Sequence, residues 1–185
     1  MAKRKRRKLR KWVYVALFVL LVLMILVIIG GYKKYSKPKY SEYLGNIEKV
    51  DLQFVKENSI YTYTQNYFNL DQYTFLSLND LYNIYSHLDQ AQMILLSKKE
   101  SMIFTLNELK VEYNYHHERF SILKGNLQND YLNSFNIKKN TFTLKKLKLD
   151  SYIVEGEVYL EKQLIEHVLF NDQCKIDLEN KQVVW

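Results

Sequence analysis

Residues 12–29 read WVYVALFVLLVLMILVII, an unbroken apolar run of 18 residues without a single charge. At about 1.5 Å per residue, a helix of this length spans roughly 27 Å, close to the bilayer hydrocarbon core of about 30 Å. A helix satisfies its own backbone amides, which any segment buried in lipid must do. The run therefore predicts a transmembrane helix, to which we assign residues 12–31.

A dense cluster of basic residues precedes the apolar run, and no acidic residue occurs before Glu42. Only four lysines follow closely, so the excess of positive charge predicts that the N-terminal side stays in the cytoplasm. Basic side chains near the surface also attract anionic lipid, at about 1 kcal/mol each. We assign membrane orientation and anionic-lipid contact to Lys3, Arg4, Lys5, Arg6, Arg7, Lys8, Arg10 and Lys11.

Aromatic residues flank the run on both sides, as is typical of the two membrane–water interfaces. Trp12 and Tyr14 are expected in one interfacial belt, and Tyr32 and Tyr35 in the other. The run has one alanine and no small-xxx-small spacing, so we expect a lipid-facing anchor rather than a packed helix pair.

Three alternatives compete with an anchor. A cleaved signal peptide has an apolar core of about 7–15 residues before a small-residue cleavage site, whereas this core is longer and ends in Ile-Ile-Gly-Gly-Tyr. A nucleic-acid-binding arm would also be basic, but orientation already explains the charge beside a span. A buried core helix is rarely so uniformly apolar. We favour an uncleaved signal-anchor with no nucleic-acid partner.

Charge and composition divide the rest of the chain. The tail takes eight of the 27 Lys and Arg residues, which leaves 19 against 20 Asp and Glu, so the net charge of +7 belongs to the tail. Pro38 and Gly45 indicate a short tether. We expect a basic cytoplasmic tail (1–11), a transmembrane helix (12–31), a tether (32–45) and one extracytoplasmic domain (46–185) with ample aromatic residues for a core.

Cys174 is the only cysteine, so the domain forms no internal disulfide, and a buried thiol is expected. The absence of a disulfide framework argues against a small animal extracellular module and is compatible with a bacterial envelope.

Hydrophobic spacing predicts an α+β domain with its helices first and a mainly antiparallel sheet after them. Residues 46–75 favour a helix through Ile60, Tyr63, Tyr67 and Leu70, although 61–64 also fit a strand. Residues 78–97 are the strongest helix, with Ser77 as a possible cap. Later stretches favour strands: a hairpin around Asn107-Glu108, strands over 142–161 with a break at Lys145-Lys146, and a closing hairpin over 174–185, while 127–135 suggest a short helix.

The residues able to carry chemistry do not form a recognisable site. His116 and His117 are adjacent, and on a strand they would point to opposite faces, which suits no shared metal. His87, His167 and Cys174 lack motif partners, and no phosphate-binding glycine loop occurs. We therefore predict no catalytic, cofactor-binding or metal-binding residues and no small-molecule ligand.

A lysine cluster in the C-terminal third is a candidate surface contact, for an anionic envelope polymer or lipid headgroups. The alternative role is protection of exposed strand edges against pairing, for which lysine is the usual residue. The cluster comprises Lys138, Lys139, Lys145, Lys146 and Lys148.

These features predict a non-enzymatic envelope protein, anchored once in the cell membrane, whose outer domain binds other membrane or envelope proteins. A larger assembly for secretion or conjugation, division or wall synthesis would suit this architecture. The alternatives are an extracytoplasmic sensor or ligand-binding module, which needs a concave pocket, and a wall- or protein-modifying enzyme, which needs an acid–base pair or nucleophile.

Overall fold

The computed structural model describes residues 11–35, 43–56, 59–128, 132 and 140–185, without the side chains of residues 31–35 and 56. The chain divides into two compact units between residues 38 and 39. The first contains one helix, and the second contains the strands and the remaining helical segments.

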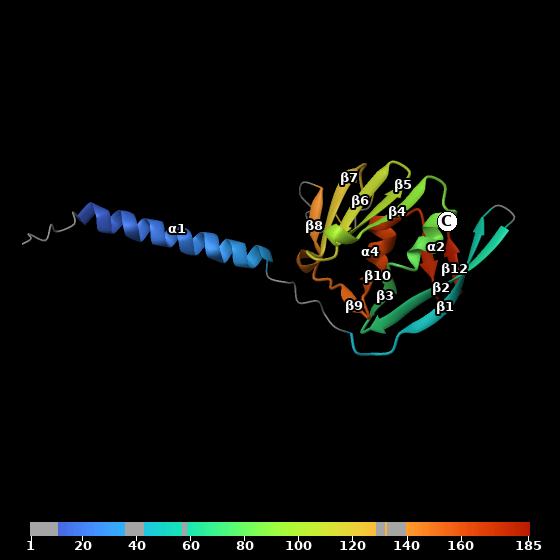
Figure 1. The fold of residues 1–185 in the computed structure, drawn as a ribbon. Coiled ribbons are helices and arrows are strands. Elements are labelled where there is room, and N and C mark those ends of the chain that lie inside the picture. Colours follow the sequence, from blue (N-terminus) through green and yellow to red (C-terminus); the bar gives the residue numbers. More distant parts are fainter. Residues whose placement is uncertain (1–10, 36–42, 57–58, 129–131, 133–139) are drawn as a thin grey trace, which may run out of the picture. The chain divides into compact units, whose positions relative to one another are not determined.

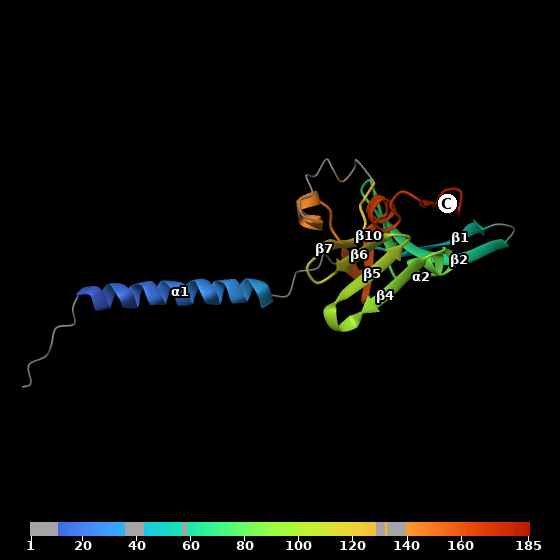
Figure 2. The same ribbon diagram turned by 90° about the horizontal axis from the view of Figure 1, so that it is seen from above.

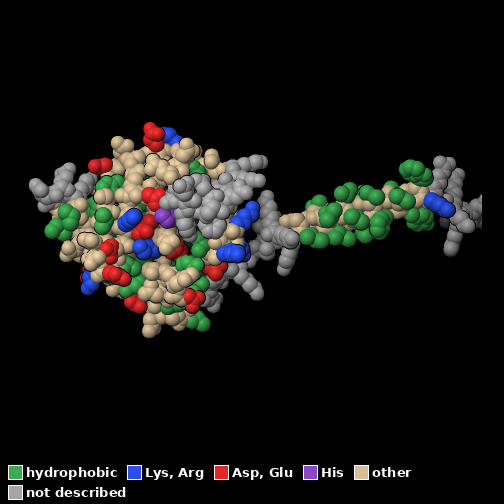
Figure 3. All heavy atoms as spheres, turned by 180° about the vertical axis from the view of Figure 1, so that it is seen from behind, with side chains coloured by type: hydrophobic (Ala, Val, Ile, Leu, Met, Phe, Trp, Pro, Cys, Tyr) green, Lys and Arg blue, Asp and Glu red, His purple; other side chains and the backbone are tan. Residues whose placement is uncertain are grey.

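The N-terminal helix α1 runs from Lys11 to Tyr35, so it includes the first residues of the predicted tether. Its segment Lys11–Gly30 is long and apolar enough to cross a membrane, and none of that segment is buried. Apolar side chains cover the visible face of α1 (Figure 3). The predicted N-terminal apolar helix is therefore confirmed.

The second unit is rich in β-structure, and its described strands form two sheets (Figure 1). The seven-stranded sheet has the order β11-β12-β1-β2-β3-β10-β9, and only its β1–β12 pair is parallel. Its strands are β1 (Glu48–Lys56), β2 (Ser59–Leu70), β3 (Tyr73–Ser77), β9 (Tyr152–Val154), β10 (Glu157–Glu161), β11 (Lys175–Asp177) and β12 (Gln182–Val184).

The five-stranded sheet is antiparallel throughout, in the order β4-β5-β6-β7-β8 (Figure 1). Figure 2 shows β4 to β7 of this sheet from above. Its strands follow one another along the chain, and β4 to β7 are joined by short turns. They are β4 (Ala91–Leu96), β5 (Ser101–Leu106), β6 (Leu109–Asn114), β7 (Arg119–Lys124) and β8 (Thr141–Thr143).

Short helical segments lie between the two sheets, where one hydrophobic core joins all of them (Figure 1). Helix α2 (Leu81–His87) contacts β2 of one sheet, and its Tyr85 ring lies 5.6 Å from the Phe104 ring of the other. Helix α4 (Lys162–Leu164) contacts β3, and the π-helical turn η3 (Ile165–Leu169) contacts β5. The described chain also contains the 3-10 turns η1 (Ser97–Lys99), which has no buried residue, and η2 (Leu144–Leu147).

An aromatic cluster covers the opposite face of the seven-stranded sheet. Phe68, Phe75 and Tyr159 are buried there. The Tyr43 ring stacks on Phe68 with centroids 3.8 Å apart, so the chain segment that enters the domain packs over this face. Strands β3 and β10, and β2 near Phe68, therefore have buried residues on both faces.

The predicted helix over residues 46–75 is wrong, because these residues form strands β1, β2 and β3. Tyr63 and Gln65 point into the main core and Phe68 points to the other face. Gln65 is polar but buried, and Phe68 is buried on the opposite face. The polar–apolar alternation by which a strand is recognised is therefore lost in the sequence.

The predicted helix over residues 78–97 is only partly right. Helix α2 ends at His87, Leu88 is extended, and Gln90 adopts a positive φ of 53° before β4 begins. Ser77 is not the cap; Asp80 holds the N-cap position and makes no side-chain capping bond. Two long strands precede this short helix, so the domain is α+β but its helices do not come first.

Several predicted strands are confirmed. β5 and β6 pair across Asn107-Glu108, and β11 and β12 form the closing antiparallel hairpin. The predicted break at Lys145-Lys146 is the 3-10 turn η2. Of the short helix predicted over 127–135, residues 129–131 and 133–135 lie outside the described part of the chain.

Candidate functional site

The segment after β10 begins with a buried carboxylate. Glu161 is 3% exposed, and its Oε2 accepts a hydrogen bond from the N–H of Leu164 at 2.9 Å, which caps α4. Burial raises the pKa of Glu161, and the backbone N–H donors of Gln163 and Leu164 oppose that shift. Glu161 therefore ends β10 and begins α4 with the same carboxylate.

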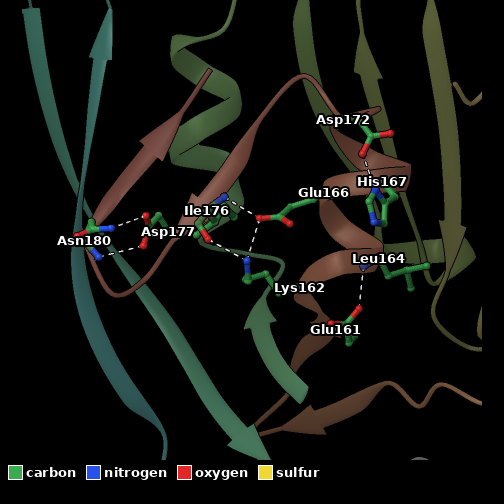
Figure 4. A network of polar contacts seen from close by, with 9 residues as sticks. All are labelled: Glu161, Lys162, Leu164, Glu166, His167, Asp172, Ile176, Asp177 and Asn180. Atoms are coloured by element: carbon green, nitrogen blue, oxygen red, sulfur yellow. Dashed lines mark hydrogen bonds and ion pairs between the residues drawn. The ribbon is translucent and has the colours of Figure 1, made fainter. Parts of the chain in front are cut away.

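A second carboxylate one helical turn later joins this segment to the C-terminal hairpin (Figure 4). The Oε1 of Glu166 accepts the backbone N–H of Ile176 at 2.7 Å and the Nζ of Lys162 at 3.1 Å. Lys162 also donates to the Ile176 carbonyl at 3.1 Å. Both backbone groups of Ile176 are thus satisfied by side chains, which attaches β11 to the helical segment.

His167 and Asp172 form a third polar contact in the same region (Figure 4). The imidazole Nδ1 lies 2.5 Å from the Asp172 Oδ1, and both side chains are partly exposed. A carboxylate on Nδ1 can orient an imidazole for proton transfer. An open depression of about 710 Å³ borders His167, Lys162 and Lys175.

Cys174 does not supply a nucleophile to this pair. The thiol is buried, which confirms the expected state of the cysteine. Burial raises its pKa far above the ordinary value, and the Glu166 carboxylate raises it further. Since the thiolate is the reactive form, Cys174 is suited to packing rather than to covalent chemistry.

His116 and His117 lie on the turn between β6 and β7, not on a strand as expected. His116 Nδ1 lies 2.6 Å from a Glu100 carboxylate oxygen, and the His117 backbone N–H donates to the Asn114 side chain. Within the described ranges, no group of three or more His, Cys, Asp or Glu residues could hold a metal ion. The His116 ring pairs with a carboxylate and contacts the His117 ring edge to face, with centroids 4.7 Å apart.

The described members of the lysine cluster lie on and just after η2, which follows the end strand β8. Lys145, Lys146 and Lys148 are exposed. The Nζ of Lys145 lies 3.9 Å from a carboxylate oxygen of the buried Glu118. Lys138 and Lys139 lie outside the described residues.

Few of the predicted membrane-contacting residues are described. Lys11 begins α1, and Trp12 and Tyr14 are exposed on its first turn. Tyr32 and Tyr35 belong to the last turns of α1, without described side chains. The other basic residues of the tail (Lys3, Arg4, Lys5, Arg6, Arg7, Lys8 and Arg10) lie outside the described part.

A depression of mixed polarity at the C-terminal hairpin was not predicted from the sequence. Phe54, Val55, Leu88 and Trp185 contribute to a hollow of about 440 Å³. Trp185 is 52% exposed and Val55 is 59% exposed. A half-exposed tryptophan beside other apolar groups is typical of a protein-binding surface. Only pairing between β1 and β12 brings these distant positions together.

No family model, curated protein or solved structure matches this chain.

Proposed function

We propose that this protein is anchored once in the cell membrane of a bacterial envelope, with a cytoplasmic N-terminus and an extracytoplasmic domain. The observation that carries the proposal is α1, whose span is apolar, uncharged and exposed along its length. Exposure of so many large apolar side chains to water is unfavourable, and insertion of the helix into a lipid bilayer removes this free-energy cost. The basic residues before it support the orientation.

We propose further that the outer domain is a non-enzymatic assembly subunit of a larger membrane complex for secretion or conjugation, division or wall synthesis. Two features support this role: the hollow beside Trp185, and the use of Glu161 and Glu166 as structural hydrogen-bond acceptors. Aromatic anchors in apolar hollows dominate the energetics of many protein interfaces.

Protease accessibility in intact spheroplasts tests the topology. External proteinase K should remove the domain, detected by an antibody to residues 46–185, while a cytoplasmic marker survives. The control is the same digestion after detergent lysis, where both proteins are degraded. Survival of the domain in intact spheroplasts and its loss only after lysis would contradict the orientation.

Affinity capture from gently solubilised membranes tests the assembly role. The full chain should recover partner proteins, and Trp185→Ala should reduce that recovery several-fold. Tyr82→Ala is the matched control, because Tyr82 is 57% exposed on α2 and does not line the hollow. Recovery of the wild-type protein alone, at full yield, would count against an assembly subunit.

Ligand binding is a second candidate function, favoured by an amide-rich depression of about 500 Å³. Its lining includes Asn107, Asn126, Gln128, Asn171 and Gln173. Such groups donate and accept hydrogen bonds and suit the hydroxyls of neutral sugars. Stabilisation against heat by N-acetylglucosamine oligomers, lost in Asn126→Ala, would support this function over assembly.

A further inference from the structure

We propose that two copies of this chain associate by antiparallel pairing of their β4 strands, which joins the two five-stranded sheets into one. The inference deepens the proposed assembly function, on which it rests for the anchoring of both copies in one membrane. It concerns a different surface from the hollow beside Trp185.

Strand β4 differs from the other strands that end the two sheets. It is six residues long, reads AQMILL and carries no charge. The ends β8, β9 and β11 have three residues each, and β11 carries charges. Short length and charge within the strand protect a sheet edge, and β4 has neither, although Lys98 and Lys99 follow it on η1.

The outer edge of β4 is open among the described strands, since β4 pairs only with β5. Ile94 is 36% exposed and Leu95 is 57% exposed, although successive residues of a strand point to opposite faces. Apolar side chains are thus accessible on both sides of this edge.

The backbone groups that face outward can be identified. The N–H of Asn107 donates to the carbonyl of Gln90 at 3.1 Å, and this pair continues the register in which Ala91 faces Leu106. Hydrogen-bonded pairs alternate along an antiparallel ladder, so positions 92, 94 and 96 bond to β5. Ala91, Met93 and Leu95 therefore direct their N–H and C=O groups away from the sheet.

A second copy fits these groups in one symmetric register. A two-fold axis perpendicular to the sheet places Met93 opposite itself and Ala91 opposite Leu95 of the second copy, so all three outward-facing residues of each strand form hydrogen-bonded pairs. Gln92 then faces Ile94. Because β4 carries no charge, its pairing with a second copy places no like charges opposite one another.

Anchoring explains why so short a contact suffices. Two chains held in one membrane have a high effective concentration, so weak pairing becomes populated without a large interface. An extended segment of another protein could also pair with β4, and the experiments below distinguish that occupant from a second copy.

Oxidative crosslinking of variants with one added cysteine in native membranes tests the register, with wild type as the control because its Cys174 is buried. Met93→Cys should give a disulfide-linked dimer, since paired Cα atoms lie about 5.5 Å apart, within the range for a disulfide. Gln92→Cys and Ile94→Cys should each crosslink poorly on their own, because position 92 of one copy faces position 94 of the other. The two copies of position 92, or of position 94, are about 7–8 Å apart. Co-expression of those two variants should restore the crosslink.

Proline scanning tests the backbone contact. Leu95→Pro removes an N–H that points outward, so β4 should still pair with β5 while the dimer weakens on the order of tenfold or more. Leu95→Ala is the matched control, which shortens the side chain and keeps the N–H. Light scattering of the detergent-solubilised full chain measures the dimer, and circular dichroism checks the fold.

The two experiments distinguish the proposed dimer from its alternatives. A crosslink strongest at position 93, with a dimer lost in Leu95→Pro and kept in Leu95→Ala, supports the proposal. A crosslink strongest at 94, no crosslink at any position, or a crosslink from 93 to a different protein overturns it. Affinity capture through the hollow beside Trp185 is unaffected by any of these results, so the assembly function would fail or survive separately.

Discussion

At the scale of single residues, Cys174 lies in the core close to the hydroxyls of Tyr63 and Tyr85, and the thiolate is disfavoured there. We expect the folded protein to resist the thiol reagent DTNB at pH 8 and to react fully only after denaturation. Ser86→Cys, at an exposed position of α2, should react within minutes as a positive control. Rapid reaction of native wild type would contradict burial of the thiol.

Glu161 combines a stabilising contact with an electrostatic cost. Its raised pKa means that the ionised form is penalised in the folded state, so this penalty is absent below the ordinary pKa of about 4.5 and grows as pH rises through the folded value. Glu161→Gln keeps an acceptor for the Leu164 N–H. We expect it to raise the free energy of unfolding at pH 7, with a difference that vanishes below pH 4.5.

Glu161→Ala separates the two effects, since it removes the acceptor as well as the charge. We expect it to cost about 1 kcal/mol, the usual loss of a helix cap. Glu155→Gln is the matched control at an exposed turn position. Urea unfolding at several pH values measures each variant, and a Gln variant less stable than wild type at pH 7 would contradict the burial penalty.

At the scale of elements, α2 depends on packing rather than on its own propensity. A helix of seven residues is marginal in water, and α2 persists because Leu81, Ile84 and Tyr85 are buried. The Tyr85 hydroxyl donates to the Leu169 carbonyl at 2.7 Å.

Tyr85 variants test that dependence. Tyr85→Phe leaves the buried Leu169 carbonyl without its donor and should cost about 1–2 kcal/mol, while Tyr85→Ala should cost about 3–5 kcal/mol through the cavity. Tyr82→Phe, on the exposed side of the same helix, should be neutral. Urea unfolding measures the differences, and equal effects at 85 and 82 would contradict the packing argument.

The orientation of α1 should follow from charge alone. Replacing the eight basic residues before the apolar run by Gln leaves Lys33, Lys34, Lys37 and Lys39 as the dominant positive charges. We expect a large share of molecules to invert and become protected from external protease in spheroplasts. Replacing those four lysines instead should leave the orientation unchanged, and no inversion in the first variant would show that charge does not set it.

At the scale of the whole molecule, residues 39–185 form one compact unit whose two sheets share a core. We therefore expect a fragment 39–185 to be soluble and to unfold in a single cooperative transition. Coincident transitions by tryptophan fluorescence and far-ultraviolet circular dichroism would check this. Separate transitions would mean that the sheets are independently stable.

The local sequence pattern was enough to predict the structure of segments with uniform or nearby surroundings. The apolar run at 12–29 predicts a helix because every side chain in it meets the same environment. The hairpin at Asn107-Glu108 can be predicted because its two strands are adjacent in the chain. Pattern failed at β2, where Gln65 points inward and Phe68 lies in a second buried cluster. Periodicity reports one buried face, and near Phe68 β2 has a second.

The candidate sites depend still more on the tertiary structure. The hollow beside Trp185 exists because β12 pairs in parallel with β1, more than a hundred residues earlier, and the open edge of β4 exists because no described strand follows it in the sheet. The sequence by itself determined the apolar helix, the charge before it and the buried cysteine, since solvation acts on each residue locally. The order of strands, and with it every exposed edge and hollow, was decided only by long-range pairing, whose partners no local pattern identifies.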